Sequence, residues 1–216
     1  MDSTELASKI DHTLLKPEAT PDQVEAVAAE AVELAVAAVC VSPVHVRAVH
    51  AQIAGTIGLA TVIGFPSGAH PSIVKATEAA QAIADGATEL DMVARLGAIA
   101  AADWAIVEAD IASVRDASPG VVLKVILETG LWDIDTIVRA CEVAAAAGAD
   151  YVKTSTGFHP TGGATLEAVA AMHGAVGGRL GVKASGGIGD RATAEAMIAA
   201  GATRIGASKS RAILGR

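Results

Sequence analysis

The chain has 216 residues, with 24 acidic and 16 basic side chains and a formal net charge of −8. This charge disfavours non-specific attraction to nucleic acid or to anionic membranes, and an aromatic content of only 2% argues against a surface that stacks nucleobases. The N-terminus lacks the pattern of a signal peptide and no apolar run reaches membrane-spanning length, so a cytoplasmic location is expected.

Strand-like and helix-like segments alternate along the whole chain. In the first half we expect a strand over 10–15, a helix opened by Thr20 and Pro21, a strand over 38–42, a helix over 43–53, a strand over 59–65, a helix over 71–85, a strand over 89–94 and a helix over 101–116. In the second half we expect a strand over 121–128, a helix over 133–147, a strand over 150–155, a helix over 164–174, a strand over 180–185, a helix over 190–200, a strand over 203–208 and a short closing helix.

Eight such strand–helix units fit a parallel sheet with crossover helices. The fold class predicted is α/β, a (β/α)8 TIM barrel that forms a single domain over 1–216. A doubly wound open sheet is the alternative, but it usually has fewer strands and less even spacing.

Charged side chains interrupt the fourth to seventh predicted strands. Asp91, Lys124, Lys153 and Lys183 lie in four consecutive strands. The outer face of a barrel strand packs under apolar helices, so these side chains are expected inside, near the carboxyl ends where barrel active sites lie.

A lysine in that position has a chemical consequence. Burial and a neighbouring ammonium group both lower a lysine pKa, and the neutral amine attacks carbonyl carbons. Lys153 beside Lys183 therefore predicts Schiff-base chemistry, with Asp91 as a proton relay. A single strand lysine is usually solvated, but three lysines and an aspartate on consecutive strands favour function. Lys124 remains open, since it could be only an ion-pair partner of Asp91.

Small residues follow the last three predicted strands. They let backbone N–H groups approach an anion, and the loops after strands seven and eight are the usual phosphate site of barrels. A phosphate site is therefore predicted at Thr156, Gly157, Gly186, Gly187, Gly206 and Ser208.

Other polar residues are weaker candidates. Asp11 could join the proton network, whereas His12 is expected to be a hydrogen-bonded structural residue. Cys40 could face the site but is expected to be a buried inert thiol, and Lys75 is expected to be solvated. The histidines show no metal-ligand spacing, so no metal and no cofactor are predicted.

These segments resemble one family. IDHTLLKP, AVCVSP, GFPSG, ELDMV, KVILETG, YVKTSTGF, VKASGGI and RIGAS occur in the order found in deoxyribose-phosphate aldolase, over residues 10–214. The resemblance implies a metal-independent class I aldolase, a lyase that interconverts 2-deoxy-D-ribose 5-phosphate with D-glyceraldehyde 3-phosphate and acetaldehyde. It also implies a homodimer or larger homo-oligomer.

Residue by residue, the resemblance implies that Lys153 forms the Schiff base and that Lys183 lowers its pKa. Asp91 matches the proton-relay aspartate and Lys124 its charged neighbour, while the small residues after strands six to eight surround the phosphate. The family commonly has an arginine where this chain has Gly189, and a serine where it has Lys209. Lys209 or Arg191 is a candidate to replace that positive charge.

Two other functions stay open. One is another Schiff-base aldolase with a different aldehyde pair, such as a transaldolase-like enzyme. The other is a barrel that binds a sugar phosphate without catalysis, against which the presence of both lysines and Asp91 argues.

Overall fold

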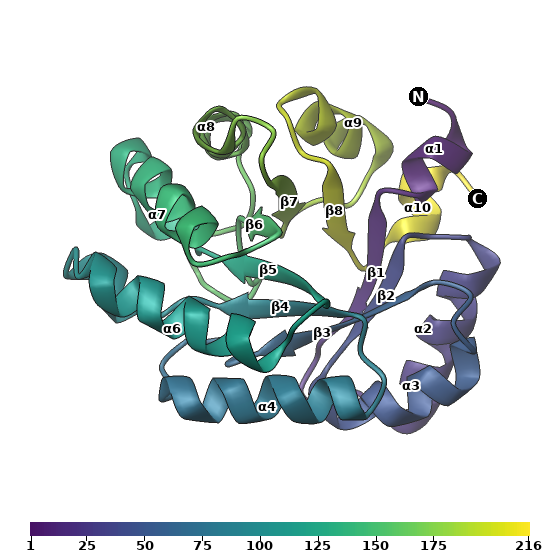
Figure 1. The fold of residues 1–216 in the computed structure, drawn as a ribbon. Coiled ribbons are helices and arrows are strands. Elements are labelled where there is room, and N and C mark those ends of the chain that lie inside the picture. Colours follow the sequence, from purple (N-terminus) through teal and green to yellow (C-terminus); the bar gives the residue numbers. More distant parts are fainter.

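The computed structural model, which describes residues 1–216, contains eight parallel strands that close into a barrel, each hydrogen-bonded to the next and the last to the first. Figure 1 shows helices packed around these strands, with the two termini side by side. The strands are β1 (Ile10–Leu14), β2 (Ala38–Val41), β3 (Gly58–Ile63), β4 (Glu89–Val93), β5 (Val122–Ile126), β6 (Tyr151–Lys153), β7 (Gly181–Ser185) and β8 (Arg204–Ala207). The prediction of a single-domain (β/α)8 barrel is confirmed, and the open-sheet alternative is wrong.

The helices follow the predicted order with three differences. They are α1 (Ser3–Ala7), α2 (Pro21–Glu33), α3 (Val46–Ile53), α4 (Ser72–Ala84), α5 (Leu96–Ala100), α6 (Trp104–Ala117), α7 (Ile134–Ala146), α8 (Leu166–Val176), α9 (Arg191–Ala199) and α10 (Ser210–Leu214). The short helix α1 was not predicted, and the helix expected over 43–53 begins as a 3-10 turn at Pro43–His45.

The third difference lies after β4, where the short unpredicted helix α5 precedes α6, the helix that was predicted over 101–116. Ala102 adopts a left-handed backbone conformation with φ of 52°, which ends α5. Asp103 then caps α6, because its side chain accepts a hydrogen bond from the backbone N–H of Ile106.

The barrel interior is divided by polarity. A small apolar cluster fills the β1–β3 side, and it consists of Leu15, Ala38, Cys40, Ala60 and Val62 with Phe65 packed against them. The larger apolar core lies between the strands and the helices. Asp11 of β1 and the charged side chains of β4 to β8 occupy the rest of the interior, and the strand alternation predicted that the charged residues of strands four to seven point inward.

Lys75 corrects one expectation, since it is fully buried rather than solvated. Its Nζ donates to the Asp110 carboxylate at 2.7 Å and to the backbone carbonyl of Val93 at 2.8 Å. The lysine stem passes beneath Gly64, where an added Cβ would lie 2.8 Å from Lys75 Cε. The pair joins α4 and α6 to the carboxyl end of β4. The ion pair could not be predicted from the sequence, because Asp110 lies 35 residues from Lys75 on a helix with an amphipathic pattern.

Substitution of Lys75 by Met should destabilise the fold by about 3–5 kcal/mol, because it leaves the buried carboxylate of Asp110 without a cation. The double variant Lys75→Met, Asp110→Leu should recover most of that loss. Urea unfolding of the three proteins measures both effects. Equal losses in the single and double variants would show that the ion pair is not the cause.

Candidate active site

A single carboxylate lies at the centre of the charged side of the barrel. Asp91 on β4 accepts hydrogen bonds from three ammonium groups: Lys124 at 2.8 Å on Oδ1, and Lys153 at 2.6 Å and Lys183 at 2.7 Å on Oδ2. The strand register explains the convergence, since Asp91 pairs with Lys124 and Lys153 pairs with Lys183. All four side chains are buried.

A second row of charges surrounds this centre. Asp11 on β1 accepts a hydrogen bond from Lys183, and Glu89 forms an ion pair with Lys124 at 2.6 Å. Arg204 on β8 contacts Glu89 at 2.6 Å and Asp11 at 3.1 Å. The sequence analysis missed Arg204, although the alternation of β8 places it on the same face as the predicted Gly206.

The charges of this cluster do not balance when every group is ionised. Three carboxylates (Asp11, Glu89 and Asp91) face four cations (Lys124, Lys153, Lys183 and Arg204), which leaves one excess positive charge. An uncompensated charge in a buried site is costly, and the usual response is that one group gives up its charge. Loss of one lysine proton brings the cluster to neutrality.

The lysine that loses its proton most readily is Lys153. Burial lowers its pKa, and the positive charge of Lys183 lowers it further, against the opposing effect of Asp91. The pKa values of Lys183 and Lys124 are raised instead, because the effect of nearby carboxylates outweighs the effect of burial. Asp11 and Asp91 raise the pKa of Lys183, and Asp91 raises that of Lys124. Only Lys153 is thus favoured as a neutral amine.

The carboxylates are held ionised. Burial alone would raise the pKa of Asp91, but the ammonium groups of Lys124, Lys153 and Lys183 together lower it well below its ordinary value. The pKa of Asp11 is lowered in the same way, with burial opposed mainly by Lys183 and Lys124. Asp91 is therefore a hydrogen-bond acceptor in contact with the Lys153 amine.

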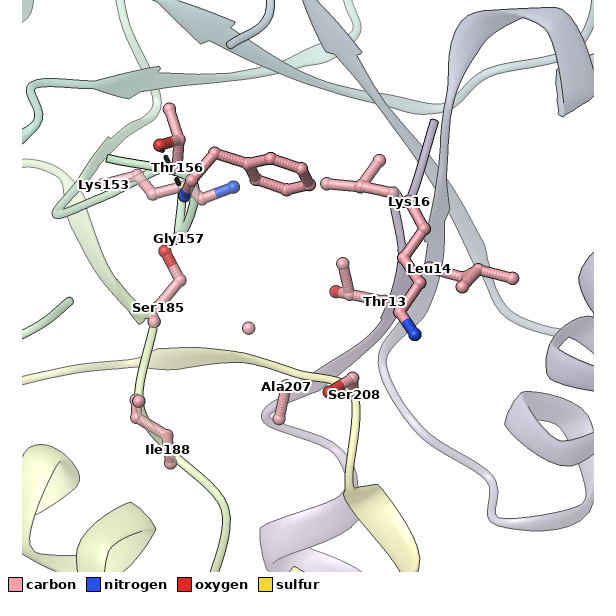
Figure 2. A pocket seen from close by; sticks show the side chains of 15 residues that line it. Thr13, Leu14, Lys16, Lys153, Thr156, Gly157, Ser185, Ile188, Ala207 and Ser208 are labelled. Atoms are coloured by element: carbon pink, nitrogen blue, oxygen red, sulfur yellow. Dashed lines mark hydrogen bonds between the residues drawn. The ribbon is translucent and has the colours of Figure 1, made fainter. Parts of the chain in front are cut away.

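A pocket of about 340 Å³ opens above the charged cluster at the carboxyl ends of the strands. Lys153 is the only member of the cluster that lines it, whereas Asp91, Lys124, Lys183 and Asp11 lie below. All of the residues predicted for phosphate also line it, namely Thr156, Gly157, Gly186, Gly187, Gly206 and Ser208. Figure 2 shows Lys153, Thr156 and Ser185 on one wall, and Thr13, Leu14 and Lys16 of the β1 end on the other.

Local contacts fix the loops around the pocket. Glu128 accepts hydrogen bonds from the hydroxyl of Thr156 at 2.6 Å and from its backbone N–H at 3.2 Å. Gly163 approaches the backbone of Gly186 so closely that an added Cβ would lie 2.1 Å from the Gly186 carbonyl oxygen. Gly206 also has little space for a side chain, since a Cβ there would lie 3.2 Å from the Lys183 stem and 2.9 Å from the Ser185 Cβ.

The weaker candidates are resolved by their contacts. Cys40 belongs to the buried interior cluster, and burial together with the charge of Asp91 raises its pKa to about 11. His12 is buried and its Nδ1 lies 2.7 Å from the Ser210 hydroxyl, as expected of a structural histidine. The guanidinium of Arg191 binds Glu195 and Ser3, and neither Arg191 nor Lys209 lines the pocket.

The fold and the site together define a class of protein. A buried amine with a lowered pKa opens into a pocket at the carboxyl ends of a closed parallel barrel, which is the position of barrel active sites. A neutral lysine amine is a nucleophile toward carbonyl compounds. The class is a barrel enzyme equipped for carbonyl chemistry.

Comparison with known proteins narrows this class. The family model described as DeoC/LacD family aldolase matches residues 5–216. A deoxyribose-phosphate aldolase of Mycolicibacterium paratuberculosis is 59% identical over 97% of this chain and 96% of the relative, and one of Kocuria rhizophila is 54% identical over 97% and 95%. The chain belongs to the DeoC/LacD family of aldolases.

A solved structure agrees with this assignment. A deoxyribose phosphate aldolase from Aeropyrum pernix, whose structure is described as tetrameric, superposes with a TM-score of 0.89 at 35% identity over 99% of this chain and 91% of that chain. None of the helices in the present structure combines the length and the apolar character that a membrane crossing would require.

The role of Lys183 in setting the pKa of Lys153 can be tested by substitution. Lys183→Met removes the neighbouring positive charge and leaves the Asp91 oxygen to Lys153, so the pKa of Lys153 should rise and the neutral amine should appear only at higher pH. Labelling of Lys153 with propanal and cyanoborohydride, followed by peptide mass spectrometry across pH, measures this shift. Lys183→Arg keeps the charge and should label as the wild type does. A profile that does not move in Lys183→Met would contradict the assigned cause.

Proposed function

We propose that the chain is a class I deoxyribose-phosphate aldolase that cleaves 2-deoxy-D-ribose 5-phosphate reversibly to D-glyceraldehyde 3-phosphate and acetaldehyde. The observation that carries this is the amine of Lys153, which alone among the three lysines bound to Asp91 has a lowered pKa and alone among them reaches the pocket. The identity of 54–59% with relatives named for this activity supports the choice of substrate.

In this mechanism the neutral Nζ of Lys153 attacks the C1 aldehyde of the open-chain sugar phosphate. Loss of water from the carbinolamine gives an iminium on Lys153. The hydroxyl on C3 then loses its proton and the C2–C3 bond breaks, so that C3 becomes the aldehyde of glyceraldehyde 3-phosphate. The electron pair of the broken bond passes to the iminium and leaves an enamine. Protonation of the enamine at C2 and hydrolysis release acetaldehyde and restore the amine.

Asp91 and Lys183 have complementary parts in this scheme. Asp91 touches the Lys153 nitrogen and is placed to exchange protons with it, either directly or through a water molecule. Lys183 stays charged, lowers the pKa of Lys153 and stabilises the ionised form of Asp91. Lys124 and Asp11 are supporting groups: Lys124 holds the second oxygen of Asp91, and Asp11 holds Lys183.

The phosphate is placed against the loops after β6, β7 and β8. Gly186 and Gly187 have φ of 86° and 80°, which favours glycine, and none of the backbone or side-chain acceptors of the chain takes their N–H groups. These N–H groups, with the Ser208 hydroxyl, are suited to phosphate oxygens. The same proposal includes a homo-oligomer, a cytoplasmic location and no nucleic-acid or membrane partner, and the tetrameric Aeropyrum relative supports the first of these.

Borohydride reduction during turnover should trap a covalent adduct on Lys153, identified by mass spectrometry of its peptide. Lys153→Met should lose the adduct and at least about 10³-fold in kcat, because no other neutral amine reaches the pocket. The wild type should release acetaldehyde, measured with a coupled dehydrogenase assay. An adduct on another residue, or one that survives in Lys153→Met, would refute the assignment. Turnover without acetaldehyde release would point to a different aldehyde pair.

A further inference from the structure

The loop after β1 places a lysine on the wall of the pocket. Leu15 turns into the barrel and is 8% exposed, so the next residue, Lys16, points the other way and is exposed. Lys16 lines the same pocket as Lys153, Gly187 and Ser208. Figure 2 shows its side chain across the pocket from Lys153, with the ammonium on the side of Thr13 and Ser208.

Lys16 is the lysine of the pocket wall whose charge is not engaged within the protein, and Lys209, which is also unpaired, does not line the pocket. Lys153 binds Asp91, and Arg191 binds Glu195. No hydrogen bond or ion pair joins Lys16 to any side chain of the protein. Its positive charge is therefore available to a ligand.

The surroundings of Lys16 favour an anion. None of the fifteen residues that line the pocket is an aspartate or a glutamate. Gly186 and Gly187 line the same pocket, and their N–H groups donate no hydrogen bond within the protein. The chain as a whole carries a net charge of −8, so a doubly charged phosphate needs a local positive charge to enter.

We propose that Lys16 supplies this charge, in place of Arg191 or Lys209, and makes the enzyme prefer phosphorylated over unphosphorylated sugars. This inference rests on the proposed function for its substrate. It assigns Lys16 to the phosphate at C5, while Lys153 takes the aldehyde at C1, so the two lysines hold opposite ends of one molecule. Lys16 then acts on substrate binding and leaves the chemistry at C1 unchanged.

The kinetic test compares 2-deoxy-D-ribose 5-phosphate with 2-deoxy-D-ribose. Lys16→Met should raise KM for the phosphorylated sugar about tenfold, with little change in kcat, because a charge-assisted contact is lost. It should leave kcat/KM for the unphosphorylated sugar unchanged. Lys16→Arg should restore the preference, and Lys209→Met, which removes a lysine outside the pocket, should behave as the wild type. Equal losses on both sugars, or a loss of preference in Lys209→Met instead, would overturn the proposal.

A second measurement separates this inference from the activity itself. Inorganic phosphate should raise the melting temperature of the wild type and of Lys209→Met, and should inhibit turnover competitively, whereas Lys16→Met should respond only at about tenfold higher phosphate. Failure of the wild type to cleave either sugar would refute the proposed function and leave this phosphate response as the test of Lys16. An unchanged phosphate response in Lys16→Met would refute the role of Lys16 even in an active aldolase.

Discussion

The structure depends on one shared carboxylate. Asp91 is buried in the interior of the barrel and accepts hydrogen bonds from three lysines on three neighbouring strands. Because the surrounding cluster holds four cations and three carboxylates, full ionisation leaves an excess charge that burial penalises. The network of Asp11 and Glu89 keeps Lys183 and Lys124 charged. Lys153 is therefore the lysine that loses its proton most readily, and it is also the lysine of the cluster that lines the pocket.

This arrangement joins stability and function in the same residues. The lysines are tolerated inside the barrel because the carboxylates satisfy them, and removal of Asp91 would leave the buried ammonium group of Lys153 without an ion-pair partner. The charged side chains around Lys153 are buried, which strengthens the electrostatic effects that they exert on its amine. The pocket above the charged cluster is lined by small residues and by N–H groups without an acceptor in the protein. These groups suit an anionic substrate and would orient it, which the charged cluster alone would not do.

Much of this could be predicted from the sequence, because local signals carried it. The alternation of strand residues placed Asp91, Lys124, Lys153 and Lys183 on one face, and glycine-bearing loops marked the pocket. The features that could not be predicted depend on contacts between segments that are distant in the sequence. Lys75 and Asp110 occupy positions on amphipathic helices, so their buried ion pair was not predicted, and neither was the close approach of Gly206 to the Lys183 stem. The proposal that Lys16 rather than Lys209 contacts the phosphate also depended on the loop positions, which only the structure shows.

The central claim is that Lys153 alone among the three lysines bound to Asp91 has a depressed pKa. Its most direct test is an NMR titration of the lysine side chains in the ligand-free protein, with Lys153 assigned by comparison with a Lys153→Met variant. The account predicts that Lys153 loses its proton below the ordinary lysine range, while Lys124 and Lys183 remain protonated above it. A Lys153 amine that titrates at or above the ordinary value, or together with the other two, would contradict it.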